Sequence, residues 1–169
     1  MTRPPGQIAS TLKSLIITGD GSGIGLKLAL QLVAPGNTVI ICGRDASKLA
    51  EAVHLAGAQA VTRDVTVAED QDRILSDIQA QHGRLDLRIG NAGIFLAYDF
   101  RNVPDRLQRI EREIAINATA PLTLARRALP LLEKNARPGI VFVGSAVAFV
   151  ASPATPVYSG TRALIHHCA

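Results

Sequence analysis

Short apolar runs alternate with stretches of helical periodicity along the chain. The first run covers residues 15–17, and a glycine-rich segment follows it. In residues 26–33 the apolar positions recur at i, i+3, i+4 and i+7, which is one face of a helix, and Pro35-Gly36 is expected to end it. These positions are Leu26, Ala29, Leu30 and Val33. The pattern therefore begins with a strand, a glycine turn and a helix.

The alternation continues to the end of the chain. β-branched and apolar runs predict further strands at 38–42, 59–62, 85–89 and 139–143. Helical spacing predicts helices at 45–56, 68–82, about 104–113 and 114–134. The helix at 114–134 is apolar on most sides and is expected to be buried. A last helix begins at Pro156, with Thr155 as its N-cap and proline at its first position.

Strands separated by helices form βαβ units, whose right-handed crossovers build a parallel sheet. We therefore predict an α/β protein with a Rossmann-like, doubly wound parallel sheet in the strand order 3-2-1-4-5. There is no repeat and no interdomain linker, so residues 1–169 are interpreted as one domain. With 169 residues the chain is long enough for one core.

Composition narrows the classes of function. The net charge is +4, but two Tyr, four Phe and no Trp offer few platforms for stacked bases, so nucleic acid is a poor partner. The run from Arg106 to Glu113 mixes both signs and is typical of a solvated helix face. No apolar run reaches the roughly 20 residues of a membrane helix, and the N-terminal segment has no signal-peptide pattern. A cytoplasmic location and no membrane partner are therefore expected.

Metal binding is not predicted. Cys42 and Cys168 have neither metal-ligand spacing nor a disulfide framework around them. His166 and His167 are adjacent near the end of the chain, and we interpret them as polar positions on the last helix.

The segment "TGDGSGIG" at residues 18–25 joins the first strand to its helix. Glycines allow a tight turn and a close approach of backbone N–H groups to a phosphate, and the helix start adds a positive dipole end. In this strand–turn–helix context the segment favours a dinucleotide site. The alternative is a glycine-rich turn without a ligand.

The sequence resembles the short-chain dehydrogenase/reductase family over about residues 12–169. "TGDGSGIG" fits the family's T-G-x-x-x-G-I-G loop, and "GNAG" at 90–93 is similar to its N-N-A-G segment. Asn117 in "INATAP" and the spacing S-x12-Y-x3 from Ser145 through Tyr158 to position 162 also match. In "AFVASPATPVYSGT" the chain is most similar to bacterial members described broadly as oxidoreductases.

The resemblance implies a nicotinamide dinucleotide and a set of residues that contact it. In the glycine loop they are Gly19, Gly21, Ser22, Gly23, Ile24 and Gly25. Asp64 and Val65 are implied at the adenine. After the fourth strand the contacts are Asn91, Ala92 and Gly93, and Tyr158 and residue 162 complete the set.

The end of the second strand indicates which dinucleotide is bound. An acidic residue there would select NAD, but this chain has Gly43 followed by Arg44. An arginine can pair with a ribose 2′-phosphate, so NADP is expected over NAD. Asp45 could neutralise Arg44 or contact a ribose. Asp20 in the glycine turn would repel a pyrophosphate and is interpreted as a possible helix cap.

The catalytic residues implied by the resemblance are Ser145, Tyr158, residue 162 and Asn117. Tyr158 would give a proton to the forming alkoxide and Ser145 would hold the carbonyl oxygen. Tyr158 and residue 162 are four apart and share a helix face, where a cation favours the phenolate. The family has lysine at this position and this chain has Arg162, which keeps the charge but is larger and planar.

Three functions follow from these residues. The first is an NADP-dependent oxidoreductase acting on a small-molecule carbonyl or alcohol, in which Arg162 in place of lysine would impair the reaction. The second is a non-catalytic dinucleotide-binding pseudoenzyme or fragment. The third is a lyase similar to halohydrin dehalogenases, which carry Ser, Tyr and Arg at this spacing; the intact Gly23 and Gly25 argue against it because those enzymes have lost the cofactor loop.

Other departures from the family pattern concern packing. Arg88 occupies an aliphatic position of a central strand, and Gly90 replaces the first asparagine of N-N-A-G. Family chains continue beyond this one, so later strands and the substrate lid are expected to be missing and the fifth strand to be an edge. The resemblance implies a homo-oligomer through the helices at about 114–134 and from 156 onward.

Overall fold

The computed structural model describes residues 14–19, 21–34, 36–97 and 106–169, with the side chain of Arg106 excepted. Five strands form one parallel sheet in the order β3-β2-β1-β4-β5. This confirms the predicted fold and strand order. The strands are β1 (Ser14–Thr18), β2 (Thr38–Gly43), β3 (Gln59–Thr62), β4 (Leu87–Gly90) and β5 (Gly139–Phe142).

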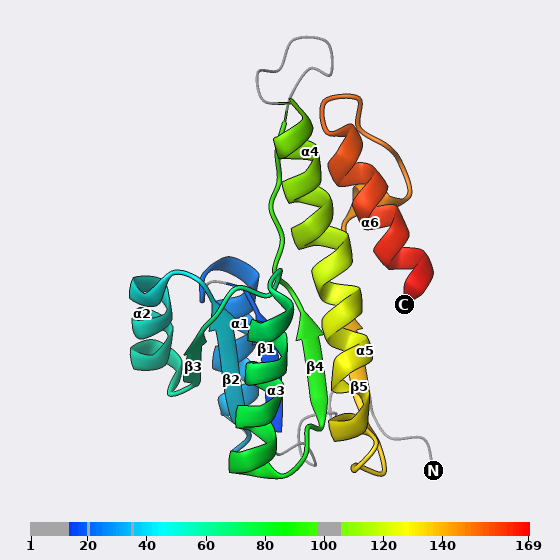
Figure 1. Ribbon diagram of the computed structural model, residues 1–169. Coiled ribbons are helices and arrows are strands. Elements are labelled where there is room, and N and C mark those ends of the chain that lie inside the picture. The colour runs from blue at the N-terminus through cyan, green and yellow to red at the C-terminus, as the bar shows by residue number, and fades with distance from the viewer. Residues whose placement is uncertain (1–13, 20, 35, 98–105) are drawn as a thin grey trace, which may run out of the picture.

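Helices cover both faces of this sheet (Figure 1). The α-helices are α1 (Gly23–Val33), α2 (Ala46–Ala56), α3 (Ala68–His82), α4 (Arg106–Ile114), α5 (Ala120–Leu132) and α6 (Pro156–Cys168). A short 3-10 turn at Ala146–Ala148 lies between β5 and α6.

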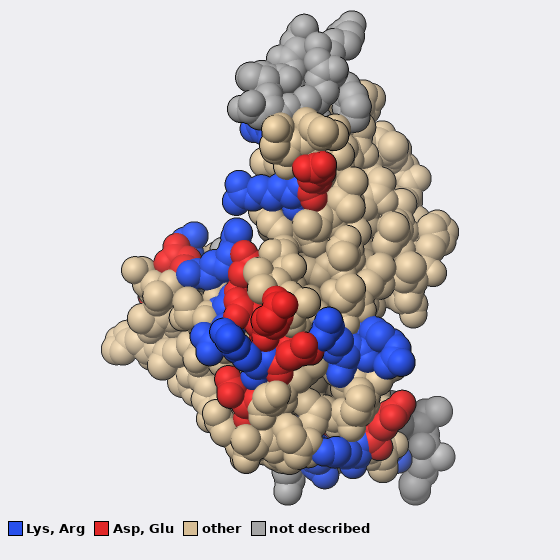
Figure 2. Space-filling view, viewed as in Figure 1, with Lys and Arg blue, Asp and Glu red and all other residues tan. Residues whose placement is uncertain are grey.

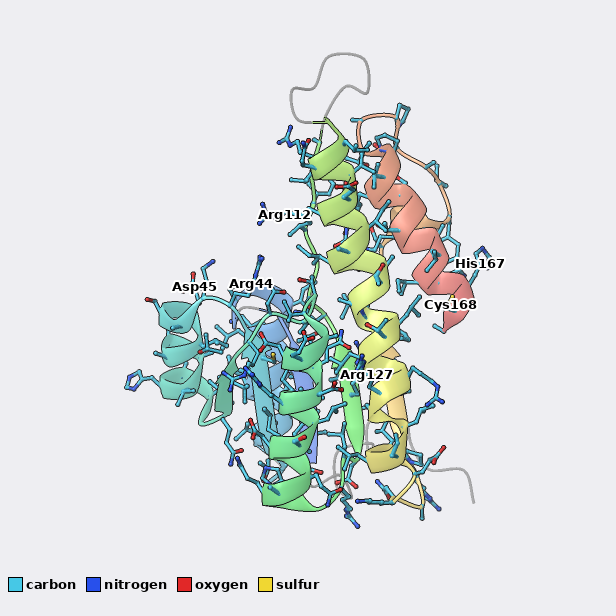
Figure 3. The ribbon with its side chains drawn as sticks, viewed as in Figure 1. Arg44, Asp45, Arg112, Arg127, His167 and Cys168 are labelled. Carbon is cyan, nitrogen blue, oxygen red and sulfur yellow. The ribbon has the colours of Figure 1, made fainter. Side chains whose placement is uncertain are left out.

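Two apolar layers hold the helices to the sheet, because successive side chains of a strand point to opposite faces. Ile17 and Ile41 pack with α1 and α2, whereas Ile16 and Ile40 pack with α3 and α5. At the surface, Arg127 of α5 forms an ion pair with Asp72 of α3 (Figure 3). Strands buried on both faces are therefore continuously apolar, as the sequence shows for 15–17 and 39–42.

α4 and α5 belong to one continuous helical rod. A π-helical turn, Ala115–Thr119, joins them, so that the rod rises beyond the sheet and α6 runs beside its α4 part (Figure 1). The sequence predicted two separate helices with a boundary at residue 114; the boundary is a change of helical type and not a break. Position 104, where the first of these helices was expected to begin, lies outside the described residues.

Several local expectations need correction. The helix at 114–134 is buried or partly buried over most of its length, as expected, but one side of it is exposed at Arg126 and Arg127. The charged run before it is not wholly solvated, because Glu113 has no exposed surface. Thr155 precedes α6 as expected, but its side chain makes no capping hydrogen bond.

β5 is the edge strand of the described sheet, as predicted. Its Ile140 and Val141 are 38% and 46% exposed, which is high for apolar side chains of a strand. Charged side chains of both signs gather over α3, whereas the surface over α6 is largely uncharged (Figure 2). None of the helices in the described parts of the chain is both long and apolar enough to span a membrane.

Candidate functional site

A cavity of about 320 Å³ opens at the carboxyl ends of the strands. In a parallel sheet this is the edge where ligands bind, at the point where strand order reverses. Here the reversal lies between β1 and β4, and the loops after both strands line the cavity. The cavity runs from the glycine turn and the end of β2 to Tyr158 and Arg162 on α6.

The glycine turn contributes Gly19, Ser22 and Ile24 to the cavity wall. Gly21 instead faces α2, where an added Cβ would lie 2.9 Å from the Cβ of Ala52. Gly23 has a positive φ of 54° and open space around it. The position of Asp20, interpreted as a possible cap, lies outside the described residues.

Asn91 explains why two residues of this turn are glycines. A Cβ on Gly19 would lie 2.4 Å from Nδ2 of Asn91, and a Cβ on Gly25 would lie 2.8 Å from the same atom. Thr18 holds the Asn91 segment in place, since its Oγ1 accepts hydrogen bonds from the N–H groups of Asn91 and Ala92, both at 3.2 Å. The loops after β1 and β4 therefore interlock through an asparagine that only glycine neighbours accommodate.

The start of α1 fits a phosphate. Ser22 is the N-cap, and its side chain makes no capping hydrogen bond, so the first N–H groups of an 11-residue helix are not satisfied by the cap. Ser22 and Ile24 both line the cavity. Backbone donors and a helix dipole at the wall of a cavity form an anion site, so these residues fit the pyrophosphate of a dinucleotide.

Arg44 and Asp45 project from adjacent positions at the carboxyl edge of the sheet (Figure 3). Asp45 caps α2, accepting hydrogen bonds from the N–H groups of Ser47 and Lys48 at 3.1 Å. These backbone hydrogen bonds, that of Lys48 foremost, lower the pKa of Asp45. Asp45 does not line the cavity, and Arg44 forms an ion pair with Asp64, with 3.6 Å between Nη1 and Oδ2. The role that the structure shows for Asp45 is the cap of α2.

Asp64 and Val65 follow β3 and both line the cavity. Burial raises the pKa of Asp64, but hydrogen bonds from Thr66 and the charge of Arg44 outweigh it, and the net pKa is lowered. The Asp64 carboxylate thus accepts hydrogen bonds from Thr66 and forms an ion pair with Arg44. The carbonyl of Val65 accepts a 2.7 Å hydrogen bond from Nε2 of buried Gln71, which ties this loop to α3.

Tyr158 and Arg162 lie at the other end of the cavity. The guanidinium carbon of Arg162 lies 4.9 Å from the centroid of the Tyr158 ring, a cation–π contact. Arg162 is only 7% exposed, and its Nη1 donates a 3.0 Å hydrogen bond to the carbonyl of Val143. Phe95 packs edge-on against the same tyrosine ring, with centroids 5.0 Å apart.

Gly93 makes room for this arginine. A Cβ at Gly93 would lie 2.2 Å from Nη2 of Arg162 and 3.2 Å from Oδ1 of Asn117. The backbone of residue 93 and the guanidinium are therefore in direct contact, which a side chain would prevent.

Asn117 is a fully buried residue of the π-helical turn. Its Oδ1 accepts a hydrogen bond from the N–H of Ile94 and its Nδ2 donates one to the carbonyl of Ile94, both at 2.8 Å. The Asn117 side chain thereby satisfies both backbone groups of Ile94, as an adjacent strand would do. It lies next to the cavity without lining it.

Ser145 is the N-cap of the 3-10 turn after β5, where its side chain accepts a 3.5 Å hydrogen bond from the N–H of Val147. It lines a smaller cavity of about 90 Å³ with Phe149 and His166, and its neighbour Gly144 lines both cavities. Tyr158, Arg162 and the glycine turn line the larger cavity, and the residue after Gly144 lies beside it.

Seven residues of the cavity wall were not predicted as site residues from the sequence. For Arg63 a signal existed, since it directly precedes Asp64 at the end of a predicted strand. The apolar residues among them gave none, because an apolar side chain at a strand end is expected in any α/β protein. The seven are Cys42, Gly43, Arg63, Ile94, Ile116, Val143 and Gly144.

Histidines and cysteines do not assemble into a metal site within the described ranges, where no group of three or more His, Cys, Asp or Glu could hold an ion. His167 and Cys168 lie on the exposed end of α6 (Figure 3).

Comparisons with known proteins agree with this geometry. A family model described as short chain dehydrogenase matches residues 13–169. The chain is 35% identical over 157 residues to the uncharacterized oxidoreductase DltE of Bacillus subtilis, covering 92% of this chain and 62% of that protein. It is 29% identical over 161 residues to the oxidoreductase asL5 of Sarocladium schorii, covering 94% and 64%.

A solved structure is also similar. The crystal structure of a short-chain dehydrogenase from Streptomyces avermitilis superposes with a TM-score of 0.82 at 26% identity, covering 94% of this chain and 58% of that one. The chain thus spans about three fifths of the length of these relatives.

Proposed function

Because the chain belongs to the short-chain dehydrogenase family of oxidoreductases, we propose that it transfers a hydride between NADP and a small carbonyl or alcohol substrate. The observation that carries this proposal is the single cavity that joins the glycine turn, Arg44 and Tyr158. A dinucleotide needs a phosphate site, an adenosine end and a reactive end within one cavity. The end of β2, the glycine turn and Tyr158 are the candidates for the adenosine end, the phosphate site and the reactive end.

When bound, the nicotinamide supplies the hydride. The start of α1 binds the pyrophosphate through backbone N–H groups. Tyr158 holds the proton that reaches the substrate oxygen, and Arg162, stacked on its ring, places a positive charge beside any phenolate that forms. Asn117 holds the backbone of Ile94 at the cavity wall and so positions the reactive end.

Preference for NADP rests on the end of β2. Gly43 offers no carboxylate to a ribose, and Arg44 lines the cavity with 44% of its side chain exposed. A guanidinium matches a phosphate with paired, charge-assisted hydrogen bonds. Asp64 competes for Arg44, but at 3.6 Å the contact is longer than a hydrogen bond and is readily exchanged.

The proposal is tested by following NADPH oxidation at 340 nm, the standard wavelength for this cofactor, with a panel of aldehydes and ketones. We expect turnover in the wild-type chain and a loss of about 100-fold or more in Tyr158→Phe. NADPH binding, followed by nicotinamide fluorescence, should survive in Tyr158→Phe. The matched control is Phe95→Leu, which removes the ring contact with Tyr158 and leaves the Tyr158 hydroxyl in place. Equal turnover in wild type and Tyr158→Phe would refute the proposed role.

A second candidate is a non-catalytic dinucleotide-binding protein. Arg162 favours it, because its guanidinium is held by the carbonyl of Val143 and the Tyr158 ring and, unlike the lysine of the family, is effectively never deprotonated. This candidate predicts NADPH binding without turnover in the wild-type chain. Turnover that Tyr158→Phe abolishes would reject it.

A further inference from the structure

Two arginines lie next to each other at the adenosine end of the cavity. Gly43 and Thr62 are paired at the ends of β2 and β3, and the N–H of Arg63 donates a 2.9 Å hydrogen bond to the carbonyl of Gly43. The parallel register thus continues past the strands and brings Arg63 beside Arg44. Both residues line the cavity.

The charge at this end is not balanced by the residues that line it. Among the described residues that line this end of the cavity, the charged ones are Arg44, Arg63 and a single aspartate, Asp64. Arg44 contacts Asp64 at 3.6 Å, and Arg63 contacts Asp70 of α3 at 3.8 Å. Both distances exceed a usual hydrogen bond. Two like charges on neighbouring strands favour an anion between them.

Arg63 is also held in place. Its Nη1 donates a 2.9 Å hydrogen bond to the carbonyl of Thr62, and its Nε is buried without a hydrogen-bond acceptor among the described residues. Asp70 in turn accepts a 2.9 Å hydrogen bond from the N–H of Asp64. The segment from 62 to 64 is therefore braced against α3, and a braced arginine loses little side-chain entropy on binding.

We infer that Arg63 is a second specificity-determining residue, which together with Arg44 binds the 2′-phosphate of the adenosine ribose. This rests on the proposed NADP site and extends it to a residue that follows β3. A phosphate monoester carries about −1.5 to −2 charges at neutral pH, which two guanidinium groups match better than one. Each arginine also contacts one aspartate, Asp64 or Asp70, so we expect the two arginines to contribute comparably to the preference.

The inference is tested with two fragments that lack nicotinamide. Adenosine 2′,5′-bisphosphate and 5′-AMP differ only in the 2′-phosphate, and calorimetric titration of the chain with each gives their affinity ratio. We expect wild type to prefer the bisphosphate, and Arg63→Gln to lower this ratio by about 10-fold while 5′-AMP binding is unchanged. Arg44→Gln should have a similar effect, and the double variant should show no preference.

Arg73→Gln is the matched control. Arg73 also contacts Asp70 at 3.8 Å, but it does not line the cavity and its side chain is 67% exposed. Its loss removes the same charge and should leave the affinity ratio unchanged. Arg63→Lys, which keeps the charge without the planar fork, should retain part of the preference. It also serves as the test variant if Arg63→Gln does not fold by circular dichroism.

The outcomes separate this inference from the proposed function. An affinity ratio that is unchanged in Arg63→Gln, or that falls equally in Arg73→Gln, overturns the role of Arg63. A wild-type chain without any preference overturns both the role of Arg63 and the choice of NADP. A preference that depends on Arg63 in a chain without hydride transfer upholds the inference and rejects the proposed reaction.

Discussion

The guanidinium of Arg88 fills the space on one face of β4 that a side chain at Gly90 would need. A Cβ on Gly90 would lie 2.7 Å from Nη1 of Arg88, so the guanidinium lies where a side chain at position 90 would begin. Arg88 has no exposed surface, and its guanidinium carbon lies 5.0 Å from the centroid of the Phe142 ring on β5. None of its three side-chain nitrogens has a hydrogen-bond acceptor among the described residues. The two departures from the family pattern on β4, arginine at position 88 and glycine at position 90, are therefore coupled.

Removing the guanidinium should stabilise the protein. In Arg88→Met the unbranched side chain keeps most of the volume, while the cost of a buried, unpaired charge disappears. We expect the free energy of unfolding to rise by about 1 to 3 kcal/mol, after the loss of the contact with Phe142. Urea unfolding measures it. The control Arg73→Met, at an exposed position, should change stability by less than about 0.5 kcal/mol. A destabilised Arg88→Met would mean that the contact with Phe142 outweighs desolvation.

The same cation makes stability depend on alkaline pH. Burial lowers the pKa of Arg88 from its ordinary value to about 10. Between about 10 and the ordinary pKa of arginine the unfolded chain binds more protons than the folded one, so raising the pH relieves the penalty. The difference in unfolding free energy between Arg88→Met and wild type should be constant below the folded pKa and shrink above about 10. Urea unfolding of both proteins across this range measures it, and a constant difference throughout would show a guanidinium that stays charged.

Gly90→Asn should depend on the residue at 88. In wild type the new side chain collides with the Arg88 guanidinium and with Phe142, whose Cδ1 lies 3.1 Å from the Cβ position. Much of the cost should disappear in the Arg88→Met background, because a flexible methionine can withdraw. A double-mutant cycle of unfolding free energies should give a coupling of about 1 kcal/mol or more. Additive effects on the unfolding free energy would mean that positions 88 and 90 do not interact.

Gly93→Ala should perturb Arg162 specifically. The Cβ would lie 2.2 Å from Nη2 of Arg162, so the guanidinium must leave its place over Tyr158. We expect destabilisation of about 1 to 3 kcal/mol, as for other overpacked sites. In Arg162→Lys, whose ammonium is smaller, Gly93→Ala should cost less. Thermal unfolding of the four proteins measures this, and an equal cost in both backgrounds would contradict the contact.

Asn117→Ala should be among the more destabilising substitutions. It leaves the N–H and carbonyl of Ile94 without their partner beside a buried turn, which costs about 2 to 4 kcal/mol. Thr119→Ala, at an exposed position of the same π-helical turn, is the control and should be nearly neutral. Urea unfolding at neutral pH compares them. Equal effects would mean that Asn117 does not brace the segment after β4.

Sequence alone predicted the sheet, its order and the elements to within a few residues. Apolar runs such as 15–17 and the glycine turn after them are local signals, and local signals determine strands, turns and helix faces. The fourth strand illustrates the limit. Its predicted range, 85–89, moved to Leu87–Gly90, because pairing with β1 and β5 decides where a strand begins and ends.

The sequence predicted the site residues that belong to motifs, but not the contacts that depend on tertiary packing. Spacing alone put Tyr158 and Arg162 on one helix face, and the structure has them in contact. It did not predict the ion pair of Arg44 with Asp64 or the presence of Arg63 in the cavity wall. These depend on loops from different strands meeting at one edge. That is a three-dimensional property, since neighbours across a sheet are distant along the chain.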